Sequence, residues 1–464
     1  MSIVTKTKTI ILCFIISLIF STSQSLVYAK LFKTIDKKAT VYNTDEKLNY
    51  INFKWWEGFD DPYLKEYLYR GVLNNHDAKK ASWKSEEYRQ FTKTTFAKEL
   101  PMLSVTSSYL GINTPNFNGN TETSENTFIL PFFMKYEADL LLKNRDKTKS
   151  SQKSFLSTKY EEKGVYITLT SNIASTYINI IKLDKNIEIF NKLMCAQCEI
   201  YSREKNKFNR GVISASELNN IKKELDNISN NLNEQIKQRE KLLNQLAVLI
   251  GDCPENNKGY QRSSFDHFDY NKEIPKCICS DKTFSRPDIM ASEELLAKYK
   301  IDIRIAKKEF FPSFNIIGVY SFNTAGPGNF FSWEASSAAI IAAATQDIFK
   351  GGMKIANLRM IKAKYEQAFE TYKQTELIAL QEVNDSLIAI KEDTLIDKQT
   401  QDKLTTTKDN NRRNINRYKS GVISKIELLD SEKNVLLAEQ ETTNSKTARL
   451  INYISLYKSV GGNL

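Results

Sequence analysis

The chain has 464 residues and a formal net charge of +11, from 66 Lys and Arg against 55 Asp and Glu. No basic run with interleaved aromatic residues stands out, so this charge indicates a solvated surface and no nucleic-acid partner. The sequence has two histidines, no glycine-rich phosphate loop and no Ser-His-Asp spacing, and we therefore expect no enzyme, cofactor or metal site.

Residues 1–29 are predicted to be a secretory signal peptide. Lys6 and Lys8 precede the apolar stretch 10–20, and small residues precede the expected cleavage site before Lys30. The apolar stretch is too short for a permanent transmembrane helix, and no later run of eighteen apolar residues exists. Any membrane crossing is therefore expected to use β-strands.

Residues 30–100 form the predicted N-terminal segment, with helices over 62–73 and 77–99. Alternating apolar and polar residues then predict a strand over 101–109 and a second over 128–136. The polar stretch between them, 113–127, is expected to be an exposed loop.

A long helical hairpin is predicted next, completing a first repeat over 101–251. Between residues 165 and 210 there is neither Gly nor Pro, and apolar residues recur every seven positions, as in a coiled coil. A second helix covers 212–250. The hairpin tip has the sequence Gly211, Val212, Ile213, Ser214.

Residues 252–284 are predicted to be an irregular connector that leads to a second repeat over 285–464. Six of the eight residues at 421–428 are identical to those at 211–218, an offset of 210. The second tip has the sequence Gly421, Val422, Ile423, Ser424. Strands over 312–320 and near 336–344, and helices over 353–420 and 422–460, complete this repeat.

Each chain thus offers four strands, which cannot close a barrel that passes solutes. A homo-oligomer is expected to complete it, and three copies give twelve strands. Five cysteines follow the signal peptide. Cys195 and Cys198 lie mid-helix without a second matching pair, so a metal or redox motif is not expected there. In an oxidising periplasm, a disulfide could form among Cys253, Cys277 and Cys279.

A series of short motifs, in this order and on duplicated halves, resembles the TolC-type outer-membrane channels of the multidrug-efflux branch. The motifs are Trp55-Trp56, Phe59-Asp60-Asp61-Pro62, Arg286-Pro287-Asp288-Ile289, Ile348-Phe349-x-Gly351-Gly352, Arg417-Tyr418-x-x-Gly421 and Leu429-Asp430. Asp347 stands where the family usually has proline.

The resemblance implies an α+β membrane protein with an internal two-fold repeat. Its homotrimer would form a twelve-stranded β-barrel in outer-membrane lipid, continued by an antiparallel α-helical coiled-coil tunnel across the periplasm of a Gram-negative-type cell. The function implied is a passive exit duct of a tripartite efflux or type I secretion system. Its partners would be a periplasmic adaptor and an inner-membrane pump of the RND or ABC type.

The resemblance also assigns roles near the tips. Both Gly-Val-Ile-Ser sequences would contact the adaptor. Glu427 and Asp430, three residues apart on one helix face, would form acidic rings that narrow the tunnel and attract cations. Glu217 is the first-half equivalent of Glu427, and the Tyr418 hydroxyl would help to hold a closed state. The alternative is that these are ordinary acids on a solvated helix and a packing aromatic.

Two other classes of protein are weighed against the duct. A periplasmic coiled-coil adaptor needs one hairpin inserted in β-rich domains, whereas this chain has two tips in register and two strand pairs. A purely structural coiled-coil protein of the envelope would need neither the strands nor a signal peptide.

Overall fold

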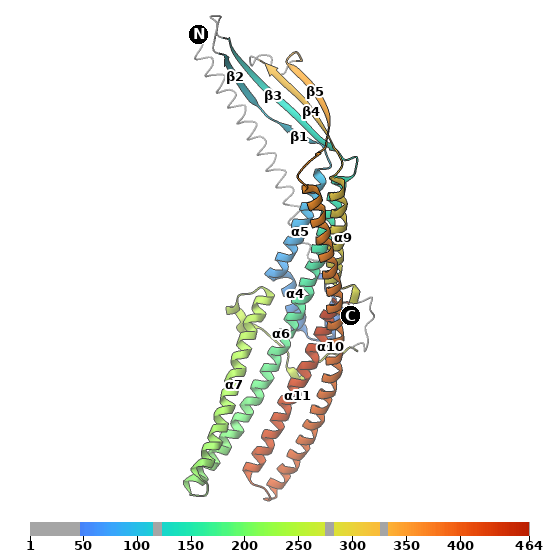
Figure 1. Ribbon diagram of the computed structural model, residues 1–464. Helices are drawn as coiled ribbons and strands as arrows, with labels where there is room; N and C mark the ends of the chain where they lie inside the picture. Colours follow the sequence, from blue (N-terminus) through green and yellow to red (C-terminus); the bar gives the residue numbers. More distant parts are fainter. Residues whose placement is uncertain (1–46, 115–122, 274–282, 325–332, 464) are drawn as a thin grey trace, which may run out of the picture. The chain divides into compact units, whose positions relative to one another are not determined.

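The computed structural model describes residues 47–114, 123–273, 283–324 and 333–463 (Figure 1). The predicted signal peptide, Cys277 and Cys279 lie outside these ranges. The chain divides into two compact units. The sheet unit contains Glu87–Phe155 and Glu294–Phe369, and the hairpin unit contains Thr44–Glu86, Leu156–Glu293 and Glu370–Leu464.

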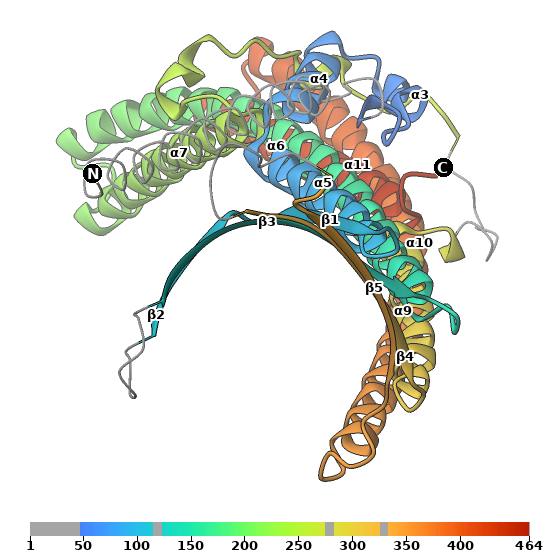
Figure 2. The same cartoon turned by 90° about the horizontal axis from the view of Figure 1, so that it is seen from above.

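The sheet unit is built on one antiparallel sheet, which Figure 2 shows as an arc. β3 lies between β4 on one side and both β1 and β2 on the other, and β5 pairs with β4. The strands are β1 Met102–Val105, β2 Ser108–Thr114, β3 Thr123–Ala138, β4 Ser313–Thr324 and β5 Ser336–Thr345.

The register places the alternating apolar residues predicted for the strands on a common face. Leu103 lies opposite Met134, and Val105 lies opposite Phe132, which is in turn opposite Tyr320. Directly opposite residues of an antiparallel pair project from the same face of the sheet. The alternation predicted for the strands over 101–109 and 128–136 is therefore confirmed.

The prediction of a single first strand is wrong, because this segment is split into β1 and β2. The split lies where Thr106 faces Pro131 of β3. The Thr106 N–H donates to the Pro131 carbonyl at 3.2 Å, but proline has no N–H to donate in return, so the ladder is interrupted. The same register then resumes, with Tyr109 opposite Phe128.

The predicted exposed loop over 113–127 is also wrong at both ends. β2 continues to Thr114, and β3 already begins at Thr123. Polar composition alone does not exclude a strand, because threonine is common in β-strands. Residues 115–122 lie outside the described ranges.

The helices follow the predicted order closely. Pro62 begins α4 as expected, and the Asp61 carboxylate caps it by accepting the N–H groups of Tyr63 at 2.8 Å and Leu64 at 2.9 Å. Every helix in the described ranges is too short or too polar to cross a bilayer. The helices are α3 Phe53–Trp56, α4 Pro62–Asn74, α5 His76–Ala97, α6 Lys143–Asn209, α7 Ala215–Ile250, α9 Pro287–Lys308, α10 Met353–Lys419 and α11 Lys425–Ser459.

An aromatic cluster forms the core of the hairpin unit, and sequence analysis did not anticipate it. Trp55 stacks on Tyr457 of α11, with ring centroids 4.4 Å apart, and Trp56 meets the same ring edge-on at 4.9 Å. Tyr270 of the connector lies 5.2 Å from Trp55. The core thus joins the N-terminal segment, the connector and the last helix.

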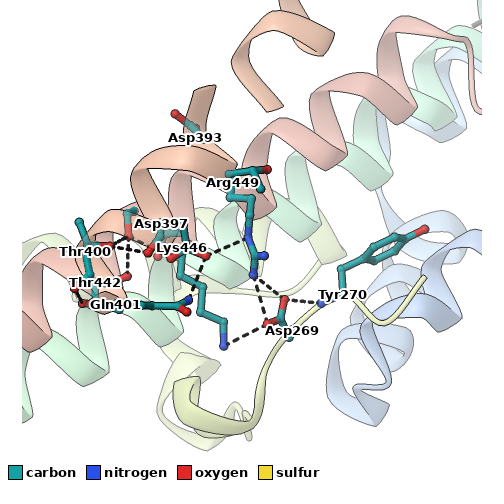
Figure 3. Close-up of polar contacts among 12 residues, drawn as sticks. Asp269, Tyr270, Asp393, Asp397, Thr400, Gln401, Thr442, Lys446 and Arg449 are labelled. Carbon is teal, nitrogen blue, oxygen red and sulfur yellow. Dashed lines mark hydrogen bonds and ion pairs between the residues drawn. The ribbon is translucent and has the colours of Figure 1, made fainter. Parts of the chain in front are cut away.

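The connector is docked on the helices by charge (Figure 3). Asp269 accepts two hydrogen bonds from Nη2 of Arg449, at 3.0 and 3.2 Å, and its Oδ2 lies 3.7 Å from the Lys446 ammonium. Arg449 Nε lies 3.3 Å from Asp397 of α10, whose carboxylate is buried. One chain of charges therefore runs from the connector through α11 to α10.

Candidate functional site

The first tip ends α6 with a Schellman motif. Gly211 has a φ of +74°, a left-handed conformation that L residues with a side chain rarely adopt. The Val212 N–H donates to the Lys207 carbonyl at 2.9 Å, and the Gly211 N–H donates to Phe208 at 2.8 Å. These bonds use carbonyls that the end of the helix would otherwise leave unpaired.

The second tip repeats this geometry. Gly421 also has a φ of +74°. The Val422 N–H donates to the Arg417 carbonyl at 2.9 Å, and the Gly421 N–H donates to Tyr418 at 2.9 Å. Figure 1 shows both tips at the same end of the hairpin unit.

Each tip then starts its second helix with a capping box. The Ser214 hydroxyl accepts the Glu217 N–H at 3.2 Å, while the Glu217 carboxylate accepts the Ser214 N–H at 2.8 Å. Ser424 and Glu427 make the same reciprocal pair, at 3.2 and 3.1 Å. α7 and α11 therefore begin three residues later than predicted. The Ser-x-x-Glu spacing was visible in the sequence and would have identified these caps.

The capping boxes give both predicted gate glutamates a local structural role. Glu217 holds the first tip, and Glu427 holds the second. Both tips also present an exposed valine at the turn, since Val212 is 68% exposed and Val422 is 64% exposed.

Glu427 and Asp430 are brought together on one groove between α10 and α11, of about 850 Å³. Arg413 and Arg417 of α10 line the same groove. Burial raises the pKa of Asp430 above its usual range; the Lys433 ammonium opposes this effect, and the Glu224 carboxylate adds to it. The sequence prediction included the acids of this groove but not its arginines.

Tyr418 lies at the end of α10 and is 38% exposed, as is its counterpart Phe208. The Lys425 ammonium lies 5.7 Å from the centre of the Tyr418 ring. Within the described part of this single chain, the Tyr418 hydroxyl has no hydrogen-bond partner.

Cys195 and Cys198 are exposed, free thiols on α6, and Cys253 is an exposed, free thiol after α7. The disulfide prediction for Cys277 and Cys279 falls outside the described ranges.

Comparison with known proteins gives one consistent answer. The family described as Outer membrane efflux protein matches residues 68–252 and 282–462. The cation efflux system protein CusC of Escherichia coli strain K12 is 24% identical over 415 residues, covering 89% of this chain and 90% of that protein. The probable efflux pump outer membrane protein TtgC of Pseudomonas putida is 25% identical over 416 residues, covering 88% of this chain and 84% of that protein.

Solved structures agree. The CmeC outer membrane channel of Campylobacter jejuni has a TM-score of 0.80 and 25% identity, covering 89% of each chain. The outer membrane protein VceC of Vibrio cholerae shares the fold, with a TM-score of 0.77 at 17% identity, covering 89% of this chain and 99% of that one. The chain therefore belongs to the outer membrane efflux protein family and is an outer-membrane duct for efflux.

Proposed function

We propose that three copies of this chain form the exit duct of a tripartite efflux or type I secretion system. The two repeats, 101–251 and 285–464, each contribute strands and a hairpin, and the connector 252–284 joins them. The observation that carries the proposal is the pair of tips with one geometry, at the same end of the hairpin unit. A chain with two matched, exposed tips is built to meet a repeated partner surface.

Two kinds of uncovered surface support the homotrimer. Among the described strands, β2 pairs only with β3 and β5 pairs only with β4, so the sheet has open edges that other strands can pair with. In addition, α10 exposes Leu377, Ile388 and Leu395, at 62%, 61% and 50%. Spacings of 11 and 7 residues place these side chains on one helix face. Neighbouring copies would cover both surfaces.

The sheet supports contact with outer-membrane lipid. Its common face carries Phe132, Met134, Tyr320 and Leu103. β1 and β2 occupy one strand position beside β3, so three copies supply twelve positions. These would close a barrel whose lipid-facing residues alternate with those of the lumen. Helices that are too polar for lipid would then continue as the tunnel on the periplasmic side.

The tips are proposed as the contact with a periplasmic adaptor, which couples the duct to an inner-membrane pump of the RND or ABC type. Gly211 to Ser214 and Gly421 to Ser424 are exposed or half-buried, and their backbone is fixed by the motifs described above. Relatives of similar identity are named for cations in one case and toluene in another. We therefore assign the choice of cargo to the pump.

The gate is proposed at the second tip. In a trimer, Glu427 and Asp430 would supply six carboxylates, and like charges gathered in a constriction attract cations. Tyr418 beside the second tip and Glu217, the equivalent acid at the first tip, are also proposed as gate residues. Because Glu427 also caps α11, its charge and its structural contribution must be separated by experiment.

The test of the assembly is the mass of the protein purified in mild detergent, measured by light scattering before and after heating. We expect a mass of three chains that falls to one chain on heating. A monomer under all mild conditions would contradict the duct. Crosslinking from cysteines placed at Ser214 and Ser424 would then identify the adaptor.

A further inference from the structure

A buried lysine links the two hairpins of this chain. Lys433 of α11 is 8% exposed, and its ammonium donates to Gln197 of α6 at 2.6 Å and to Glu224 of α7 at 2.5 Å. Gln197 is 1% exposed and donates in turn to the Glu224 carboxylate and the Ile221 carbonyl, both at 3.3 Å. A third oxygen, of Asp430, lies 3.8 Å from the ammonium.

Close to this link, the apolar contacts between the hairpins come from side chains of a kind that repeats along the helices. Leu436 of α11 packs against the cluster of Phe190, Leu193 and Leu232 in the first hairpin. Aliphatic side chains repeat along coiled-coil helices, so packing of similar quality recurs after a slide of one turn, about 5.4 Å. A buried charge does not tolerate such a slide, because the ammonium would move away from its oxygen partners and into an apolar contact.

We propose that Lys433 is a positioning residue that fixes the register of the second hairpin on the first. A single polar residue at a core position of a coiled coil is known to specify register, often without adding stability. A fixed register keeps the two Gly-Val-Ile-Ser tips level with each other. That consequence rests on the proposed adaptor contact, whereas the register itself does not.

The groove beside this link provides a direct readout. Cys195 of α6 lines a groove with Glu432 and Val435 of α11. These two positions are three residues apart, so they lie about one turn apart on the helix. In a chain whose other cysteines beyond residue 29 are serine, Glu432→Cys or Val435→Cys is introduced singly. The ratio of the two disulfide yields with Cys195, under mild oxidation, reports the register.

With no further substitution, we expect one of the two introduced cysteines to give most of the disulfide with Cys195. Lys433→Met with Gln197→Leu replaces both buried polar groups by apolar ones of similar size, which keeps the fold. We expect this double substitution to bring the two disulfide yields closer together. Their ratio should change by roughly fivefold, the size expected for the loss of one buried polar coupling. The melting temperature should change little, because the link defines position more than stability.

The matched control is Lys408→Met, which removes an exposed lysine that pairs with Glu439 within the second hairpin, at 3.2 Å. It should leave the ratio unchanged. An unchanged ratio in the Lys433→Met, Gln197→Leu chain would overturn the proposal, and so would equal yields in the starting chain. The assay reads thiols within one chain, so its result stands whether or not the trimer and the duct are confirmed.

Discussion

Glu427 combines two roles that a matched pair of substitutions can separate. Its carboxylate accepts the Ser424 N–H at 3.1 Å, and its own N–H donates to the Ser424 hydroxyl at 3.2 Å. Glutamine at this position can keep the reciprocal hydrogen bond but carries no charge. Glu427→Gln therefore removes the charge alone, whereas Ser424→Ala removes the cap and keeps the charge.

The expected magnitudes differ accordingly. Ser424→Ala should destabilise the start of α11 by about 1 kcal/mol, which raises local opening roughly fivefold. Glu427→Gln should leave that opening nearly unchanged. In the proposed trimer, however, it removes three of six carboxylates, so cation selectivity should fall. Adding Asp430→Asn should lower selectivity further, and Glu427→Ala with Asp430→Ala should raise single-channel conductance.

Two assays read the two roles. Hydrogen exchange of the amides at 421–427 measures the cap, and the reversal potential of single channels in a planar bilayer under a salt gradient measures the charge. If Ser424→Ala shifted the reversal potential as much as Glu427→Gln, the effect would come from tip conformation and the separation would be refuted. Unchanged conductance and selectivity in the doubly substituted chain would remove both acids from the gate.

Three further predictions follow from geometry and charge. Because the pKa of Asp430 is raised, its carboxylate is protonated at a pH where an ordinary aspartate is still charged. Cation selectivity should therefore fall as the pH drops through that range. Asp430→Asn should abolish this fall, and an identical pH profile in both proteins would contradict the prediction. A Cβ added at Gly211 would meet no atom within 4 Å, but the residue has a φ of +74°. Gly211→Ala should therefore cost about 1–2 kcal/mol in backbone strain, and protease cleavage at the tip should rise. Gly259→Ala, whose added Cβ also meets open space, should leave this cleavage unchanged. Asp269→Asn should loosen the connector, seen as faster hydrogen exchange over 260–270, and unchanged exchange would show that aromatic packing alone holds it.

The long helices and their tips could be predicted because their signals are local and repeated. A glycine at each tip, a seven-residue apolar repeat along the first hairpin and an offset of 210 residues between the halves are all visible in the sequence. The sheet faces could be predicted for the same reason, since alternation is a short-range pattern. The capping boxes can also be predicted, because each tip carries the Ser-x-x-Glu spacing.

The missed features depend on contacts between distant segments. The split of the first strand is caused by Pro131, which lies 25 residues after Thr106 and faces it only once the strands pair. The link from Lys433 to Glu224 crosses 209 residues. A single lysine in a long polar helix carries no signal of its own burial, so periodicity alone cannot identify such a partner.

The two tips are also preorganised. In each, a Schellman motif on one side and a capping box on the other hold the backbone before any partner arrives. A protein that binds them has little loop entropy to remove, about 1–2 kcal/mol less for each residue already fixed. Substitutions that loosen a tip should therefore weaken docking even where they touch no partner atom.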